Sequence, residues 1–129
     1  MASPAPVKYV RIFTSDDGES HLGHLDALMQ TKMFAPPAPP LDVSDPMAAS
    51  SLSLLRLPSD WHGDWHPTPA RQWLFFLAGK VEMEVSDGVI HFASAGSIVL
   101  LEDASGKGHR TRVVGGDAVI IAAVQVPAL

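Results

Sequence analysis

Side chains that bind metals and move protons gather in one short segment, Trp61-His62-Gly63-Asp64-Trp65-His66. If this segment is extended, His62, Asp64 and His66 share one face, and the two tryptophans share the other. Imidazole nitrogens and carboxylate oxygens are ligands for divalent metals, and the same groups act as acids and bases. The pattern therefore predicts a site on an inner wall, anchored from behind by two large apolar rings.

Two further polar groups are placed where such a site would need them. Gln72 begins the apolar stretch Trp73-Leu74-Phe75-Phe76-Leu77, and leaving a buried amide unpaired costs about 1–3 kcal/mol. His109 follows the turn Gly106-Lys107-Gly108, which has the flexibility to carry an imidazole inward. A site requires both side chains to converge with His62 and His66; the alternative for Gln72 is a hydrogen bond to a neighbouring loop carbonyl.

Short apolar stretches separated by turn residues dominate the chain after residue 50. The expected strands are Ser51 to Leu57, Gln72 to Ala78, Val81 to Val85, Val89 to Ala93, Ile98 to Leu101, Arg110 to Val114 and Val119 to Val126. Seven short strands at this spacing are typical of an all-β sandwich or barrel. Asp87-Gly88 between two of them is a strong hairpin signal.

Residues 1–50 are expected to form an N-terminal arm packed on a core of residues 51–129, the two making one domain. Lys8 to Phe13 is rich in β-formers, whereas Gly23 to Phe34 places Leu25, Leu28 and Met29 at helical spacing and is a candidate short helix or loop. The proline cluster of residues 34–40 must be extended. It is interpreted as a surface connector, a strap across one barrel end, or an arm that docks on a neighbouring subunit.

Composition excludes several classes of function. The 129 residues include no cysteine, which rules out disulfides, zinc fingers and thiol catalysis. The net charge is −5 and the basic residues form no run, so neither nucleic acid nor a membrane surface is an expected partner. The N-terminus lacks a basic segment followed by an apolar one, and a cytoplasmic protein is expected.

From about Leu54 to Val124 the chain resembles the cupin superfamily of small jelly-roll β-barrels. The first cupin motif, His-x-His, a short spacer, Glu, six residues and Gly, is matched by Asp64-Trp65-His66, Gln72 and Gly79. The second motif is matched by Gly96 and Gly106-Lys107-Gly108-His109, with two extra residues and no proline. Asp64 and Gln72 thus replace a histidine and a glutamate.

The resemblance implies a single cupin jelly-roll barrel, with an N-terminal strand and a proline-rich strap, and a homodimer. It also implies a divalent metal, Fe, Mn, Ni or Zn, held by Asp64, His66, Gln72 and His109. Neutral Gln72 would weaken binding and leave the metal more electrophilic. A metal-free barrel, in which these groups act as acid, base or ligand-binding donors, is the alternative.

The expected function is transformation of a small organic substrate inside the barrel. The metal would act as a Lewis acid in an isomerase, cyclase or lyase, while His62, Asp64 or His109 moves a proton. A non-heme iron dioxygenase and a non-catalytic small-ligand-binding cupin are the alternatives. The expected pocket walls are Trp61, Trp65, Leu74, Phe76 and Met83. Glu102 and Asp103 are interpreted as a solvated turn, and Arg71 and Arg110 as solvent-facing charges.

Overall fold

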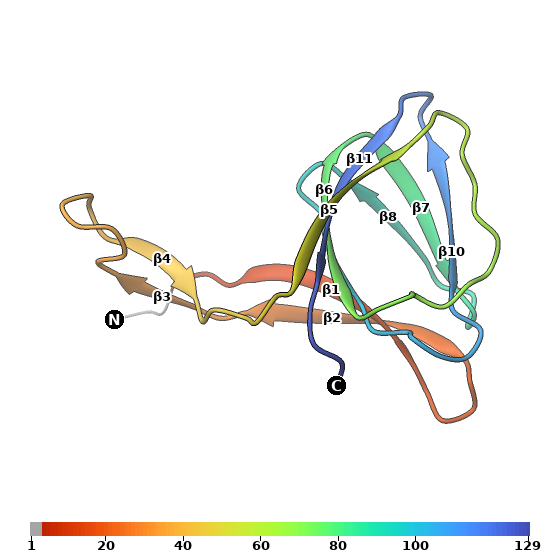
Figure 1. The fold of residues 1–129 in the computed structure, drawn as a ribbon, viewed down its shortest axis with the longest axis horizontal. Helices are drawn as coiled ribbons and strands as arrows, with labels where there is room; N and C mark the ends of the chain where they lie inside the picture. The colour runs from red at the N-terminus through yellow and green to blue at the C-terminus, as the bar shows by residue number, and fades with distance from the viewer. Residues whose placement is uncertain (1–3) are drawn as a thin grey trace.

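The computed structural model describes residues 4–129, which form an all-β fold of two facing sheets and a projecting hairpin (Figure 1). This confirms the predicted fold class. The strands are β1 (Val7–Thr14), β2 (Ser20–Ala27), β3 (Met29–Lys32), β4 (Leu41–Ser44), β5 (Ser51–Leu57), β6 (Gln72–Ala78), β7 (Lys80–Val85), β8 (Ile90–Ser94), β9 (Ile98–Leu101), β10 (His109–Val114) and β11 (Val119–Gln125).

The larger sheet has the order β2-β1-β9-β6-β11-β5, and the smaller has the order β10-β7-β8. Their inner faces enclose one core, because apolar side chains alternate with outward ones along the facing strands. The most deeply buried core side chains include Ile12, Val81, Val85, Val99 and Val119. The jelly-roll core thus forms a barrel with the site residues near one end.

The strands expected from the apolar stretches after residue 50 all form, with ends shifted by one residue at most. Ser86-Asp87-Gly88-Val89 joins β7 to β8 as a tight turn, in which the Gly88 amide donates to the Val85 carbonyl at 3.0 Å. Gly88 adopts a φ of 97°, which a residue with a side chain rarely reaches. The hairpin signal at Asp87-Gly88 is therefore confirmed.

The N-terminal arm is part of the larger sheet. β1 pairs with β2 along its whole length and runs parallel to β9 through Val10 to Ile12. The candidate helix at Gly23 to Phe34 is wrong, because these residues form the end of β2 and all of β3. Leu25 and Leu28 remain 38% and 79% exposed, so no helical apolar stripe is buried and strand pairing prevails.

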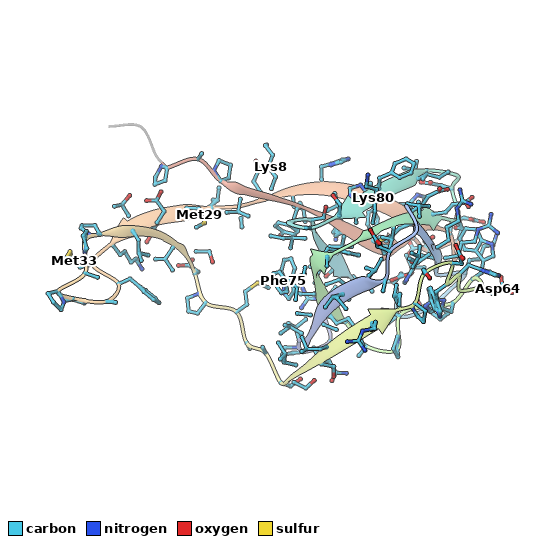
Figure 2. All side chains as sticks on the ribbon, turned by 90° about the horizontal axis from the view of Figure 1, so that it is seen from above. Lys8, Met29, Met33, Asp64, Phe75 and Lys80 are labelled. Carbon is cyan, nitrogen blue, oxygen red and sulfur yellow. The ribbon has the colours of Figure 1, made fainter. Side chains whose placement is uncertain are left out.

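The proline cluster forms the loop between β3 and β4. The prediction that it is extended is wrong, because the Ala38 amide donates to the Ala35 carbonyl at 2.9 Å and closes a turn. These two strands pair only with each other in a separate two-stranded sheet. The hairpin projects from the barrel beyond the ends of β1 and β2 (Figure 1). Figure 2 shows Met29 and Met33 on this projection, far from Asp64 at the opposite end of the molecule. Residues 4–129 contain no helix long and apolar enough to cross a membrane.

Candidate functional site

Two histidines face each other across an antiparallel bridge at one end of the barrel. The His66 amide donates to the His109 carbonyl at 3.0 Å, and the His109 amide donates to the His66 carbonyl at 3.0 Å. The two imidazole centroids are consequently 4.8 Å apart. His109 is buried, whereas His66 is exposed to solvent. The segment after Trp61 is therefore joined to β10 by isolated bridges at His62 and His66, and the second bridge sets the distance between the rings.

Gly108 allows the two segments to approach this closely. Its φ is +72°, and a Cβ built there would lie 2.0 Å from the His66 carbonyl oxygen. No side chain fits at that distance, and the backbone conformation itself favours glycine. The glycine-rich turn before His109 is thus required for close backbone approach as well as for flexibility.

A buried carboxylate holds the His109 ring. Asp103 Oδ2 lies 2.7 Å from His109 Nδ1, and the two side chains are 0% and 4% exposed. The interpretation of Asp103 as part of a solvated turn is therefore wrong. An ionised carboxylate only accepts hydrogen bonds, so Nδ1 carries a proton and the Nε2 of a neutral ring keeps its lone pair. The other carboxylate oxygen, Oδ1, is buried and has no hydrogen-bond partner among the described residues.

The same arrangement of protons follows for His66. Its Nδ1 lies 2.7 Å from the carbonyl oxygen of Asp64, which accepts a hydrogen bond and cannot donate one. The Asp64 carboxylate is occupied elsewhere, since its Oδ1 accepts from the Trp65 amide at 2.8 Å. His66 Nε2 is thus the ring nitrogen available to a ligand or metal.

Gln72 completes this group of polar side chains. Its Nε2 donates to Thr68 Oγ1 at 3.2 Å, which leaves its carbonyl oxygen free to accept or to coordinate. Gln72, His66 and His109 line one cavity of about 270 Å³. Its other walls are mainly apolar and are formed by Leu55, Leu57, Trp61, Thr68, Pro69, Leu74, Phe76, Met83, Leu101, Thr111 and Ile121.

Four of the five predicted pocket walls line this inner cavity: Trp61, Leu74, Phe76 and Met83. Trp65 does not line it. Its ring lies against Arg110, whose guanidinium carbon is 4.9 Å from the ring centroid. Trp65 therefore lies on the outer surface of the barrel, on the same side as the outer cavity that Arg110 and Asp64 line.

The structure separates His62 and Asp64 from the other predicted site residues. Both are exposed and line a different cavity of about 770 Å³ on the outer side of β7 and β10. Figure 2 shows Asp64 at the tip of the barrel. The simple alternation from residue 62 to 66 fails because Asp64 uses its carboxylate to hold the next amide, which turns the chain at that point.

Glu102 is the second acidic residue that was interpreted as solvated. Its side chain is 5% exposed and accepts hydrogen bonds from Arg71 Nε at 2.8 Å and Arg11 Nη1 at 3.2 Å. Arg71 is correspondingly 18% exposed and is not a free surface charge. Arg110 is more exposed and pairs with Glu84 on the outer face. The Glu102 ion pairs tie β1 to the segment that enters β6, which fixes the start of the strand bearing Gln72.

The donor set at the inner cavity fits a divalent metal of the kind that imidazole binds. His66 and His109 each offer an Nε2 lone pair, and Gln72 offers a carbonyl oxygen. Each imidazole is oriented through its other nitrogen, as is usual for metal-bound histidines. Among residues 4–129 no cluster of three or more His, Cys, Asp or Glu side chains is present. The two imidazoles and the amide oxygen that line this cavity carry no negative charge.

Asp103, Thr68 and Thr111 were not predicted as site residues. Thr68 and Thr111 belong to stretches with no chemical pattern, and only the fold brings them to the cavity. One feature of the sequence could have predicted the role of Asp103: Asp103 and His109 flank the Gly106-Lys107-Gly108 turn. A tight turn returns the chain on itself, so its two flanks can meet.

Comparison with solved structures shows that the fold of this chain is similar to that of known proteins. No protein-family model and no curated protein sequence matches the chain. A cupin 2 conserved barrel domain protein from Salinispora arenicola CNS-205 is similar in structure, with a TM-score of 0.51 and 21% identity over 78% of this chain and 76% of that chain. The cupin domain of Schizosaccharomyces pombe Cnp3 aligns over 96% of this chain and 86% of that chain, with a TM-score of 0.48 and 8% identity.

Identities at this level establish the fold and leave the activity open. The Salinispora structure is described as a cupin 2 conserved barrel domain protein and covers 78% of this chain. The predicted resemblance is confirmed at this level: the chain has the fold of the cupin superfamily.

Proposed function

We propose that this protein is an enzyme that transforms a small organic molecule in the inner cavity of the barrel. The observation that carries the proposal is the convergence of His66, Gln72 and His109 on a largely apolar cavity of about 270 Å³. Binding sites for small molecules are usually apolar hollows with a few placed polar groups. The volume lies at the lower end for such sites, which favours a compact substrate.

His66 and His109 are the titratable side chains that line this cavity. Both carry their proton on Nδ1 and present Nε2, so in the neutral form each acts as a base or as a metal ligand, but not as both at once. The two rings are fixed by the backbone bridge and by their Nδ1 partners. The site is therefore rigid before any ligand arrives, which lowers the entropy cost of binding.

We further propose that His66, His109 and the Gln72 carbonyl hold a divalent metal from the set Fe, Mn, Ni and Zn. Bound there, the metal would polarise a substrate oxygen as a Lewis acid. Three neutral donors leave the full charge of the ion in place, so binding should be weaker, and the polarisation stronger, than at a site with a carboxylate ligand. Asp103 lies behind His109 and orients its ring without entering the cavity.

The ligand types favour isomerase, cyclase or lyase chemistry over oxygen activation. Non-heme iron oxygenases use two histidines and one carboxylate. The residues that line the inner cavity include no Asp or Glu, and Asp64 lines the outer cavity instead. His62 and Asp64 line the outer cavity, so neither would move a proton at the inner site.

The test is the metal content of the purified, untagged protein by elemental mass spectrometry. The wild type and His62→Ala should both hold near-stoichiometric metal, while His66→Ala and His109→Ala should lose it. His62 is the matched control, since it is an exposed imidazole four residues from His66 that lines the other cavity. Circular dichroism of each variant verifies that the fold is kept.

No bound metal, even after reconstitution with Fe(II), Mn, Ni and Zn, would refute the metal centre. The enzyme proposal would then rest on His66 and His109 as an acid–base pair. Turnover separates an enzyme from a carrier: an enzyme consumes the small molecule that it binds, whereas a carrier returns it unchanged. A protein that binds a ligand in the cavity and returns it would be a small-ligand-binding cupin.

A further inference from the structure

A serine, a histidine and an aspartate form a chain of hydrogen bonds outside the barrel interior. Ser15 Oγ lies 2.7 Å from His21 Nε2, and His21 Nδ1 lies 2.8 Å from Asp87 Oδ2. None of these three residues lines the inner or the outer cavity. The atoms that are joined are those required of a serine nucleophile, its general base and a carboxylate that orients the base.

Two turns bring these residues together at the end of the molecule opposite the β3–β4 hairpin (Figure 1). Ser15 directly follows β1, and His21 is the second residue of β2. Because Phe13 is paired with His21, Ser15 and His21 lie diagonally across this hairpin on one face, within reach of long side chains. Asp87 comes from the β7–β8 turn, 66 residues farther along the chain.

Hydrogen bonds between the two turns fix this arrangement. Ser20 is 0% exposed, and its Oγ accepts from the Ser86 amide at 2.7 Å. In return, the Ser20 amide donates to Ser86 Oγ at 2.6 Å. The Asp87 amide donates to the Ser20 carbonyl at 3.3 Å. The backbone of both turns therefore holds Asp87 beside His21, and the site is organised before any substrate arrives.

Asp87 determines which nitrogen of His21 carries a proton. The Asp87 Oδ1 accepts from the Val89 amide at 3.0 Å, and this hydrogen bond, together with a smaller effect of His21, lowers the pKa of Asp87 below 3.8. The carboxylate is therefore ionised near neutral pH and accepts from Nδ1–H. In the neutral imidazole, Nε2 then has a lone pair that faces the Ser15 hydroxyl.

The Ser15 hydroxyl has two acceptors besides His21. Asp17 Oδ1 lies 2.5 Å from Ser15 Oγ, and the Glu19 carbonyl oxygen lies 3.2 Å from it. When the imidazole is protonated, Nε2–H donates to Ser15 Oγ and the hydroxyl donates to Asp17. When the imidazole is neutral, Nε2 accepts the hydroxyl proton. The neutral imidazole is therefore the form in which Ser15 acts as a nucleophile.

We propose that Ser15, His21 and Asp87 form a second site, which hydrolyses small carboxylic esters by acyl transfer to Ser15. Ser15 Oγ bonds to the ester carbonyl carbon while its proton passes to His21 Nε2. The bond to the leaving alcohol then breaks, and the alcohol takes the proton from Nε2. Water hydrolyses the acyl serine by the same proton transfers and releases the carboxylic acid. Asp87 positions the imidazole and does not touch the substrate.

Exposure and charge at this site define the class of ester. The His21 and Asp87 side chains are 32% and 29% exposed, so an ester reaches Ser15 from solvent without entering the barrel. Asp16 and Asp17 follow Ser15 and are exposed, and their negative charges favour neutral or cationic esters over anionic ones. The Asp16 amide donates no hydrogen bond within residues 4–129, so it is available to the oxyanion that develops on the carbonyl oxygen.

Labelling with an uncharged alkyl fluorophosphonate tests the nucleophile. An activated serine displaces fluoride from this probe, and peptide mass spectrometry locates the label, which should lie on Ser15. In His21→Ala, labelling of Ser15 should be about 100-fold slower or more, because the general base is lost. His24→Ala is the matched control and should be labelled at the wild-type rate, since His24 is an exposed histidine of the same strand with no serine partner among the described residues.

Hydrolysis of p-nitrophenyl acetate tests turnover at the same site. Ser15→Ala should lose the activity, and Ser105→Ala should keep it. Ser105 is the control because it is an exposed serine of a neighbouring turn with no histidine partner among the described residues. Circular dichroism of each variant verifies that the fold is kept.

The absence of cysteine from the chain allows a test that does not need turnover. Ser15→Cys and Ser105→Cys each introduce a single thiol, one beside His21 and one away from any imidazole partner. An ordinary thiol has a pKa of about 8.5, so only a few per cent of it is thiolate at pH 7. Iodoacetamide should alkylate Ser15→Cys about 10-fold faster at pH 7 than Ser105→Cys or the double variant Ser15→Cys/His21→Ala.

Nitrogen NMR tests the positioning role of Asp87. The Nδ1-protonated tautomer of His21 should predominate in the wild type and be lost in Asp87→Ala, and an unchanged tautomer would remove Asp87 from the site. An unlabelled Ser15, ester hydrolysis that survives Ser15→Ala, or equal alkylation of the two single-thiol variants would each overturn the proposal. None of these outcomes depends on a metal or a ligand in the inner cavity.

Discussion

Removal of the Asp103 carboxylate is the sharpest test of how the site is built. The Asp103 side chain is 0% exposed, and its Oδ2 accepts from His109 Nδ1 at 2.7 Å. In Asp103→Ala, the Nδ1 proton of a buried histidine has no partner. An unsatisfied buried donor costs about 1–3 kcal/mol, so the free energy of unfolding should fall by at least about this amount. Asp103→Asn keeps an acceptor oxygen at the same place and should lose less.

Urea unfolding, followed by tryptophan fluorescence, measures these differences. Asp117→Ala is the control, because Asp117 is exposed and makes no hydrogen bond or ion pair among residues 4–129. Its free energy of unfolding should stay within about 0.5 kcal/mol of the wild type. The order of stability expected is therefore wild type, then Asp117→Ala close to it, then Asp103→Asn, then Asp103→Ala.

One result would refute this reasoning. If Asp103→Ala unfolds at the same urea concentration as Asp117→Ala, the carboxylate does not satisfy His109 and the ring is not held through Nδ1. A second measurement on the same variants is the tautomer of the His109 ring. Nitrogen NMR should show the Nδ1-protonated tautomer of His109 in the wild type and a mixture of tautomers in Asp103→Ala.

Two further variants test particular contacts. Gly108→Ala should prevent folding or lower the melting temperature more than any other change proposed here, because its Cβ would lie 2.0 Å from the His66 carbonyl oxygen. Gly88→Ala is the control, since Gly88 also has a positive φ but has open space around the position of a Cβ. Glu19 accepts hydrogen bonds from Lys107 and Ser86, which lower its pKa below 4.5. Because the folded-state pKa is depressed, this contribution is present above pH 4.5 and is lost as the pH falls through the folded-state value. The melting temperature of Glu19→Gln should therefore fall less steeply than that of the wild type below pH 4.5, and parallel curves would contradict the assignment.

The alternation of apolar and polar residues was enough to predict most of the barrel. β7 and β10 alternate so regularly that their inner and outer faces can be assigned from the sequence. The helix expected near Leu25 failed because its apolar stretch was short, and β1 offered β2 an antiparallel partner along its whole length. The spacing of apolar residues within Gly23 to Phe34 cannot predict such a pairing, since the partner strand β1 lies outside that segment.

The candidate site was predicted in part for a related reason. Gln72 and His109 begin strands β6 and β10, His66 is bridged to His109, and the structure brings the three to one cavity. Asp64 belonged to the same pattern, yet its carboxylate caps the Trp65 amide and the residue lines the outer cavity. Asp103 shows the opposite error. An acidic pair before a glycine turn is usually solvated, and only the tertiary position of His109 explains its burial.

Stability and chemistry are inseparable at the His66–His109 bridge. The two backbone hydrogen bonds that close this end of the barrel also set the 4.8 Å spacing of the rings. Gly108 permits that spacing, and Asp103 fixes one of the two rings. A change at any of these positions alters the fold and the site together, so loss of activity there would not by itself reveal a chemical role. Gln72 is the informative exception: within residues 4–129 its side chain donates to Thr68, and its carbonyl oxygen accepts no hydrogen bond. Gln72→Leu should therefore keep the fold while removing one of the three donors. This variant separates the effect on stability from the effect on binding at the cavity.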